Sequence, residues 1–200
     1  MERPIVENKI AELLKSNTKG SVLFVDDFLD YGNQESVKKE LLRLKEKKIL
    51  VRLAHGIYLY PKIDKELGVL FPSTEDIAKA IARRDRARIV PTGVQAMNKL
   101  GLSTQVPMKV VYLTDGAARS IKVGKRTITF KNTSPKNLMA KGEISSLVIQ
   151  ALKTIGQLKV DGETLLKIQT LLKKEKKENI MNDAKLAPAW INKLLIQTII

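Results

Sequence analysis

Residues 33–61 read NQESVKKELLRLKEKKILVRLAHGIYLYP, and this stretch decides the fold of the first part of the chain. Its first half carries apolar side chains at helical spacing, which predicts a helix from Gln34 to about Lys48. Asn33 can cap this helix by accepting a hydrogen bond from an exposed backbone amide. The second half has two β-prone runs around Gly56, and this pattern predicts a β-hairpin over residues 49–61.

The segments before this stretch complete a recognisable order of elements. Residues 4–16 show helical periodicity, residues 21–24 are β-prone, and residues 25–31 predict a brief helix that Asp27 helps to start. The order is then helix, short strand, short helix, turn, longer basic helix and hairpin. This order is typical of a winged helix-turn-helix, and we assign it to a domain of residues 1–62.

The longer helix is expected to be the DNA-reading element of this domain. Val37, Leu41, Leu42 and Leu44 form its predicted buried stripe. A helix of this kind enters the major groove, its N-terminal residues face the base edges, and the hairpin reaches the flanking backbone. The predicted base contacts are therefore Gln34 and Ser36. The predicted phosphate contacts are Lys38, Lys39 and Arg43 on the helix, with Arg52 and His55 at the wing.

Two alternatives stay open for this domain. Winged helices also serve as protein-interaction modules, and a lysine-rich helix face is often only solvated. His55 is the single histidine of the chain, and it is either a phosphate or groove contact or a tolerated turn residue. One histidine cannot build a histidine-rich metal site, and no nucleophile or orienting partner is identified for a catalytic role.

The charge of the chain favours a polyanionic partner. The formal net charge is +15, from 36 basic and 21 acidic residues, and a field of this size attracts phosphate backbones. The charge is concentrated in the middle of the chain. Residues 63–142 carry a net +9, whereas residues 1–62 and residues 143–200 each carry +3. A nucleic-acid contact confined to the first domain would not require such a basic middle.

The middle of the chain begins with a predicted linker over residues 63–72. Ser73 can then cap a helix, with Asp76 three residues on as in a capping box. Four arginines crowd the end of this helix: Arg83, Arg84, Arg86 and Arg88. Cations are favoured at a helix C-terminus by the helix dipole, and contact with DNA phosphates is the alternative explanation.

The rest of the chain predicts a second domain over residues 73–200. An apolar strand is expected over residues 108–113, and a hairpin over residues 119–130 turns at Gly124. Three apolar helical patterns follow within residues 143–200. The fold class is therefore α+β: a winged helix-turn-helix, then a mixed α/β C-terminal domain with a small antiparallel sheet and terminal helices.

Composition argues against several classes of protein. The chain has no cysteine, which removes disulfides and thiolate chemistry, and no apolar run has the length of a membrane span. We expect a cytoplasmic, nucleoid-associated protein with no cofactor and no metal. The nearest acidic cluster, Asp26, Asp27 and Asp30, lies on the short helix of the first domain. Because no catalytic constellation is assembled, we predict that the protein is not an enzyme.

Two motifs resemble a known family. Residues 50–61, LVRLAHGIYLYP, look like the hairpin of the AbiEi-type antitoxins, where a winged helix ends in a Gly-x-Tyr wing. Residues 91–103, PTGVQAMNKLGLS, resemble the segment of these proteins built around an alanine, a hydrophobic residue and a closing Gly-Leu. The resemblance covers residues 5–115, whereas residues 143–200 match no part of the family pattern.

The resemblance implies a bacterial antitoxin of a type IV toxin–antitoxin pair. The N-terminal winged helix of that family helps to repress its own operon, so the implied partner is the double-stranded DNA of the operator. The oligomeric state stays open, with a dimer on DNA as one arrangement. The functional counterpart is a nucleotidyltransferase-like toxin from an adjacent gene, without a required stable complex. Because residues 143–200 depart from the pattern, a repressor without antitoxin activity stays open as the alternative.

Overall fold

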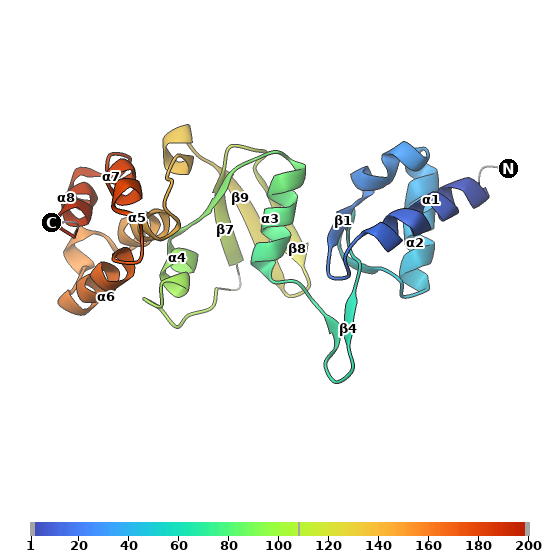
Figure 1. Ribbon diagram of the computed structural model, residues 1–200, viewed down its shortest axis with the longest axis horizontal. Coiled ribbons are helices and arrows are strands. Elements are labelled where there is room, and N and C mark those ends of the chain that lie inside the picture. Colours follow the sequence, from blue (N-terminus) through green and yellow to red (C-terminus); the bar gives the residue numbers. More distant parts are fainter. Residues whose placement is uncertain (1–2, 108, 199–200) are drawn as a thin grey trace. The chain divides into compact units, whose positions relative to one another are not determined.

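The computed structural model describes residues 3–107 and 109–198, and it is an α+β protein (Figure 1). The chain forms two compact units. The first contains residues 1–80 together with residues 122–124, and the second contains residues 81–121 and 125–200. The first unit is longer than the predicted domain of residues 1–62, because the chain up to Ala80 packs with it.

The first unit begins with six elements in the predicted order. They are α1 (Arg3–Ser16), β1 (Val22–Phe24), the 3₁₀ helix η1 (Val25–Tyr31), α2 (Gln34–Glu46), β2 (Val51–Ala54) and β3 (Ile57–Leu59). The strands form an antiparallel sheet in the order β1-β3-β2, so the last strand inserts between the first two. Gly56 adopts a φ of 70° in the turn between β2 and β3, where the left-handed conformation favours glycine.

Local side chains define where the elements of this unit begin. Asp27 Oδ2 accepts a hydrogen bond from the backbone amide of Phe24 at 2.7 Å, which fixes the start of η1 as predicted. Asn33 Oδ1 accepts from the amide of Ser36 at 2.9 Å and caps α2, also as predicted. The helices then bury their apolar faces in one core, in which Ile10, Phe28 and Leu41 are fully enclosed.

The predicted buried stripe of α2 is wrong at one position. Val37, Leu41 and Leu44 are buried, but Leu42 is 47% exposed. Val37, Leu41 and Leu44 are spaced by four and three residues and therefore lie on one face of the helix. Leu42 directly follows Leu41 in the sequence, so its side chain points away from that face. Glu40 is buried in its place, because it flanks the apolar stripe.

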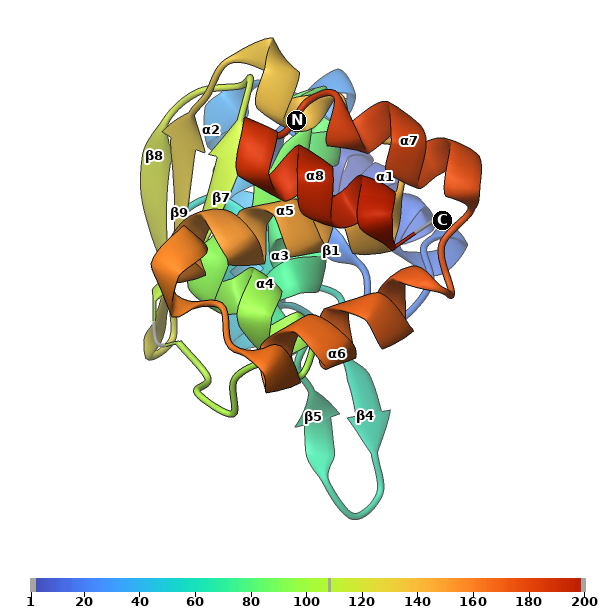
Figure 2. The same ribbon diagram turned by 90° about the vertical axis from the view of Figure 1, so that its left-hand side faces the viewer.

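The predicted linker over residues 63–72 contains a β-hairpin. Strands β4 (Lys62–Asp64) and β5 (Gly68–Leu70) pair antiparallel as a two-stranded arm (Figure 2). Asp64 Oδ1 accepts hydrogen bonds from the amides of Glu66 and Leu67, and this side chain closes the turn. The prediction missed the arm because most of its apolar side chains stay exposed and give no signal of burial.

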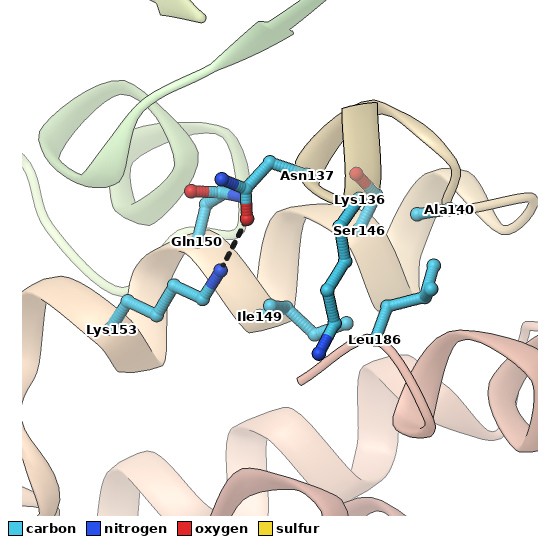
Figure 3. A pocket seen from close by; sticks show the side chains of 8 residues that line it. All are labelled: Lys136, Asn137, Ala140, Ser146, Ile149, Gln150, Lys153 and Leu186. Carbon is cyan, nitrogen blue, oxygen red and sulfur yellow. Dashed lines mark hydrogen bonds between the residues drawn. The ribbon is translucent and has the colours of Figure 1, made fainter. Parts of the chain in front are cut away.

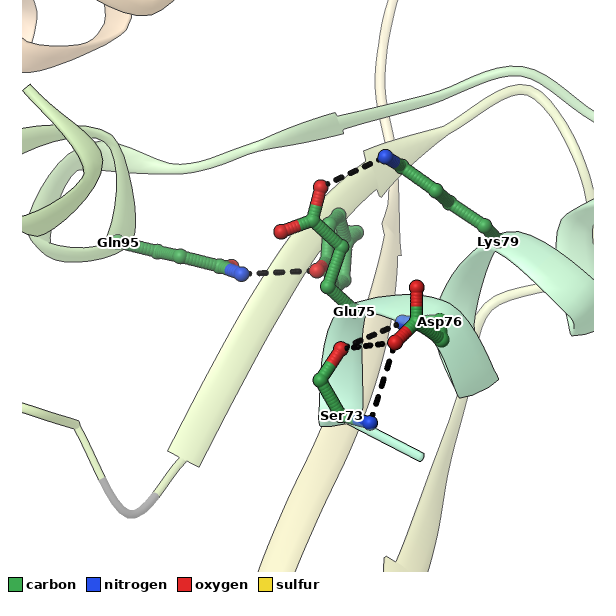
Figure 4. Close-up of polar contacts among 6 residues, drawn as sticks. Ser73, Glu75, Asp76, Lys79 and Gln95 are labelled. Carbon is green, nitrogen blue, oxygen red and sulfur yellow. Dashed lines mark hydrogen bonds and ion pairs between the residues drawn. The ribbon is translucent and has the colours of Figure 1, made fainter. Parts of the chain in front are cut away.

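Helix α3 (Thr74–Arg84) begins with the predicted capping box. The Ser73 hydroxyl donates to Asp76 Oδ2 at 2.6 Å and accepts from the amide of Asp76 at 3.1 Å (Figure 4). One turn on, Lys79 and Glu75 form an ion pair at 2.8 Å. The capping-box hydrogen bonds satisfy the amides of Ser73 and Asp76, which the first turn of a helix leaves unpaired.

The second unit contains a four-stranded sheet. Its strands are β6 (Ile89–Pro91), β7 (Lys109–Thr114), β8 (Arg119–Val123) and β9 (Arg126–Asn132), in the order β6-β7-β9-β8. Strand β7 pairs antiparallel with β6 but parallel with β9, so a wholly antiparallel sheet, as predicted here, is not formed. After β7 the chain forms β8 at the edge of the sheet and then returns as β9 between β7 and β8. The periodicity of a strand does not encode this order of strands. Met108, the predicted start of β7, lies outside the described residues.

Helices make up the rest of the second unit. They are α4 (Gly93–Lys99), the 3₁₀ turns η2 (Pro135–Leu138) and η3 (Gln157–Lys159), α5 (Glu143–Ile155), α6 (Gly162–Leu172), α7 (Lys177–Ala184) and α8 (Ala189–Gln197). The five α-helices share one apolar core, to which α5 contributes the most residues. Trp190, the only tryptophan of the chain, packs against this core and reports on its integrity.

The close contact between α4 and α5 depends on Gly93. A Cβ atom at this buried position would lie 2.6 Å from Cβ of Thr154, closer than real contacts allow. We expect Gly93→Ala to lower the free energy of unfolding by about 1–3 kcal/mol, as overpacking in a core does. Urea denaturation followed by Trp190 fluorescence measures the change.

Gly162 at the start of α6 is the matched control, because a Cβ there would meet no atom within 4 Å. We expect Gly162→Ala to leave stability equal or slightly higher, since alanine is the better helix former. Equal stability of the two variants would contradict the close packing of α4 on α5.

Candidate nucleic-acid interface

Helix α2 presents a basic face to solvent. Gln34, Lys38, Lys39 and Arg43 are exposed, and Ser36 is half-buried. The Asn33 cap holds the first turn by its bond to the amide of Ser36. The structure therefore places all five predicted contact residues of the helix where a partner can reach at least part of each side chain.

One of these cations is partly compensated within the helix. Arg43 Nη1 lies 3.4 Å from Glu40 Oε2, a carboxylate whose side chain is only 6% exposed. The second oxygen of Glu40 is buried and has no hydrogen-bond partner among the described residues. The burial of an acidic group at this position was not expected, and it reduces the net charge that Arg43 contributes to the face.

The exposed face also holds an apolar side chain that the sequence prediction placed in the core. Leu42 lies four residues after Lys38 and three after Lys39, so the three share one side of the helix. Its exposure of 47% leaves much of the isobutyl group accessible. A helical projection of residues 37–44 would have identified this position as exposed.

The β2–β3 turn holds the two predicted wing residues in contact with each other. Arg52 Nη2 lies 3.1 Å from Nδ1 of His55, and Arg52 Nε donates to the carbonyl of Ala54 at 3.3 Å. A guanidinium only donates hydrogen bonds, so Nδ1 of His55 accepts, and the neutral ring carries its proton on Nε2. Both side chains are exposed, and the pair presents N–H donors at the tip of the hairpin.

The four arginines after α3 do not form one uniform cluster. Arg84 Nε pairs with Asp85 at 2.9 Å, and Arg88 Nε pairs with Asp115 at 2.8 Å. The hydrogen bonds from Arg88 also lower the pKa of the Asp115 carboxyl, so it stays ionised. Asp85 contacts Arg119 as well. Arg83, Arg86 and Arg88 are exposed and Arg84 is half-buried, and for all four the phosphate contact stays a prediction.

The predicted residues divide between the two units. The seven residues from Gln34 to His55 belong to the first, whereas the four arginines from Arg83 to Arg88 belong to the second. The basic side chains of the β8–β9 hairpin, Lys122, Lys125, Arg126 and Lys131, are all exposed.

Two kinds of feature are absent from residues 3–107 and 109–198. No helix in these ranges is long and apolar enough to cross a membrane. No group of three or more histidine, aspartate or glutamate side chains in these ranges is placed to hold a metal ion. The acidic residues of η1 do not converge, because Asp27 turns to the backbone of Phe24.

Comparison with known proteins places the chain in a family. A model described as "Family of unknown function (DUF6088)" matches residues 9–180. No curated protein matches the chain. The structure is similar to that of the RV2827C protein from Mycobacterium tuberculosis, with 12% sequence identity and a TM-score of 0.47 over 98% of this chain and 81% of that one.

Proposed function

The chain belongs to the DUF6088 family of unknown function, and we propose that it is a sequence-specific DNA-binding regulator. In this proposal residues 1–62 are a winged helix-turn-helix, and α2 is the helix that reads the major groove. The target is double-stranded DNA upstream of its own gene, and the protein represses that gene. Association with the nucleoid follows from the same proposal.

The topology of the first unit supports the winged-helix assignment. Its element order, α1-β1-η1-α2-β2-β3, has two helical segments joined by a tight turn before a hairpin. The last strand of the hairpin, β3, lies between β1 and β2 in the sheet. In domains of this kind the second helix docks in the major groove, and the hairpin flanks it as a wing.

The exposed basic face of α2 is the observation that carries the proposal. The helix buries only its Val37, Leu41 and Leu44 side, and its opposite side presents Lys38 and Lys39 to solvent. An α-helix fits the width of the major groove. Cations along that helix lie near the phosphates that border the groove, and neutralising them releases counterions and stabilises the complex.

Each exposed side chain has a role consistent with its chemistry. Gln34 and Ser36 lie in the first turn of α2, where polar side chains meet base edges. Leu42 can contact the methyl group of a thymine, which marks that base in the major groove. At the wing, Arg52 and the Nε2–H of His55 supply donors for phosphate oxygens.

The resemblance to the AbiEi-type antitoxins extends the proposal to a pairing with a nucleotidyltransferase-like toxin. It rests on residues 50–61 and 91–103, whereas the helices within residues 143–197 have no counterpart in the quoted motifs. Growth of cells that carry the adjacent gene, with and without this chain, separates an antitoxin from a simple repressor.

Fluorescence anisotropy on upstream DNA and on a scrambled control, across a salt series, tests the proposal. We expect the upstream DNA to bind at least ~10³-fold more tightly, as specific complexes do. Lys39→Ala is expected to weaken binding equally on both sequences and to reduce the salt slope by about 1, because it removes one phosphate contact.

Two outcomes would contradict these assignments. Weak and equal binding to both DNAs would refute sequence-specific regulation and favour a protein-interaction module built on the same scaffold. A loss for Lys39→Ala on the upstream DNA alone would assign Lys39 to base recognition instead of phosphate contact.

A further inference from the structure

A small pocket in the second unit does not bring charged groups together. It lies between η2 and α5, and its enclosed part measures about 10 Å³, which is room for about one water molecule. Of its two lysines, Lys153 donates from Nζ to Asn137 Oδ1 at 2.9 Å, whereas the side chain of Lys136 points toward Leu186 (Figure 3). The surface that calls for a partner lies instead in the first unit, on the β4–β5 arm.

The arm has one apolar face. Ile63 of β4 lies directly opposite Val69 of β5, so both side chains lie on the same face of the ribbon (Figure 2). Phe71 follows Val69 by two residues, the spacing that keeps side chains on one face of an extended chain. Lys62 and Asp64 flank Ile63 and therefore lie on the opposite face. This alternation is typical of strands that bury one face against another element.

The apolar face of the arm is exposed to solvent. Ile63 is 68% exposed, Phe71 is 65% exposed, and Leu67, in the turn between the strands, is 78% exposed. Together these three side chains leave roughly 400 Å² of apolar surface uncovered, which is the size of the largest apolar patch on a typical monomer. A hairpin of two strands is also only marginally stable unless its apolar face is packed. Both properties indicate that another surface covers the arm.

The charge of the arm indicates which partner it fits. Residues 61–72 contain two lysines and two acidic residues, so the arm is neutral on a chain whose net charge is +15. The carboxylates of Asp64 and Glu66 would repel DNA phosphates, which argues against a nucleic-acid partner. Neutrality also lets two arms approach each other, whereas the like charges of two chains repel elsewhere. An identical arm offers an apolar face of the same length and width, which a two-fold axis matches to the first.

We propose that the apolar face of the β4–β5 arm packs on the same face of a second copy of this chain and forms a two-fold dimer. The two ribbons stack face to face like the layers of a small β-sandwich, with Ile63 and Val69 near the axis and the polar faces outward. Two arms bury roughly 800 Å² of apolar surface, which is at the weak end of specific interfaces, so we expect a dissociation constant on the order of 10 µM.

A dimer would supply two copies of α2 for the two halves of an operator, as two-fold DNA-binding proteins do. The inference depends on the arm alone and does not rest on DNA binding. Because the test uses no DNA, a failure of the dimer and a failure of the proposed function can be told apart.

Sedimentation equilibrium of the full-length protein tests the proposal, at loading concentrations from about 1 to 200 µM that bracket the expected constant. We expect a monomer–dimer equilibrium that salt strengthens, because salt screens the repulsion between two basic chains and leaves the apolar contact intact. Ile63→Thr with Phe71→Thr should raise the dissociation constant at least ~10-fold, since it removes most of the apolar face. Threonine keeps the β-propensity of the arm, and the core of the first unit is untouched.

The matched control removes two exposed leucines from the second unit. Leu158 is 100% exposed and Leu166 is 66% exposed, so Leu158→Gln with Leu166→Gln removes a similar amount of apolar surface away from the arm. This variant should dimerise as the unmodified protein does.

A cysteine placed on the arm reports directly on its contact with a second copy. The chain has no cysteine, so Ile63→Cys introduces a single thiol near the proposed axis. Mild oxidation should cross-link this variant faster than Leu158→Cys at the same concentration, because only the arm holds two thiols together. An unchanged dissociation constant in the arm variant or equal cross-linking of the two cysteine variants would overturn the proposal. A monomer at about 200 µM would also overturn it and would assign the arm to an unlike partner.

Discussion

Replacing Lys38, Lys39 and Arg43 together by alanine is expected to weaken binding to upstream DNA by roughly 10²–10³-fold at about 0.1 M salt. Each phosphate contact contributes about 0.9 to the salt slope, so three contacts should lower the slope by roughly 2.7. All three side chains are exposed, and alanine is the best helix former. The helix should therefore persist, as the far-ultraviolet circular dichroism spectrum would show.

The control for this variant removes three positive side chains from a different surface. Lys173, Lys174 and Lys176 are exposed between α6 and α7, in the second unit. Their joint replacement by alanine changes the net charge equally and should leave affinity within a few-fold. If both triple variants lose the same affinity, the DNA senses only the total charge, and the assignment of α2 as the reading helix is refuted.

Asp183→Ala is expected to lower the free energy of unfolding of the second unit by about 3–5 kcal/mol. The Asp183 carboxylate is fully buried on α7. It accepts hydrogen bonds from the backbone amides of Lys141 and Gly142 at 2.8 and 2.9 Å, and from the Ser145 hydroxyl at 2.5 Å. Without it, the amide of Gly142 and the hydroxyl of Ser145 are buried and unpaired, and the partly buried amide of Lys141 also loses its partner.

Trp190 fluorescence during urea denaturation measures this loss, because Trp190 packs on the core that α5 and α7 share. Asp161 is the matched control. It caps α6 through the amide of Thr164 at 2.8 Å, and this hydrogen bond lowers the pKa of its carboxyl. Asp161 is exposed, so water can replace it, and Asp161→Ala should cost much less. Equal losses would mean that Asp183 does not hold α5 in place.

Features that depend on neighbouring residues were predictable from the sequence. The caps by Asp27, Asn33 and Ser73 each join atoms three residues apart, so the chain needs no other part of the fold to form them. The same is true of helical periodicity, which located α1, α2 and α5. The seven predicted contact residues of the first unit follow from this local pattern, and their accessibility agrees with it.

The sequence predictions were wrong or incomplete where the surroundings of a side chain decide its burial or its net charge. Leu42 was placed in the core because it is apolar, although its angular position sets it among the cations of α2. The prediction that Arg84 and Arg88 contact phosphates is untested, but the sequence did not show their carboxylate partners, Asp85 and Asp115, which reduce the net charge that these two arginines offer. Asp115 is 27 residues from Arg88 in the sequence, so no local sequence pattern predicts this ion pair.

By itself, the sequence determined the helices, their caps and the basic face of α2, because these depend on interactions within one or two turns. Only the tertiary structure decided the parallel pairing of β7 with β9, the burial of Asp183 against α5 and the pocket lined by residues of η2 and α5. In each of these the groups that meet lie on different elements. Their proximity is set by strand order and helix packing, which a periodicity of 2 or 3.6 residues does not encode.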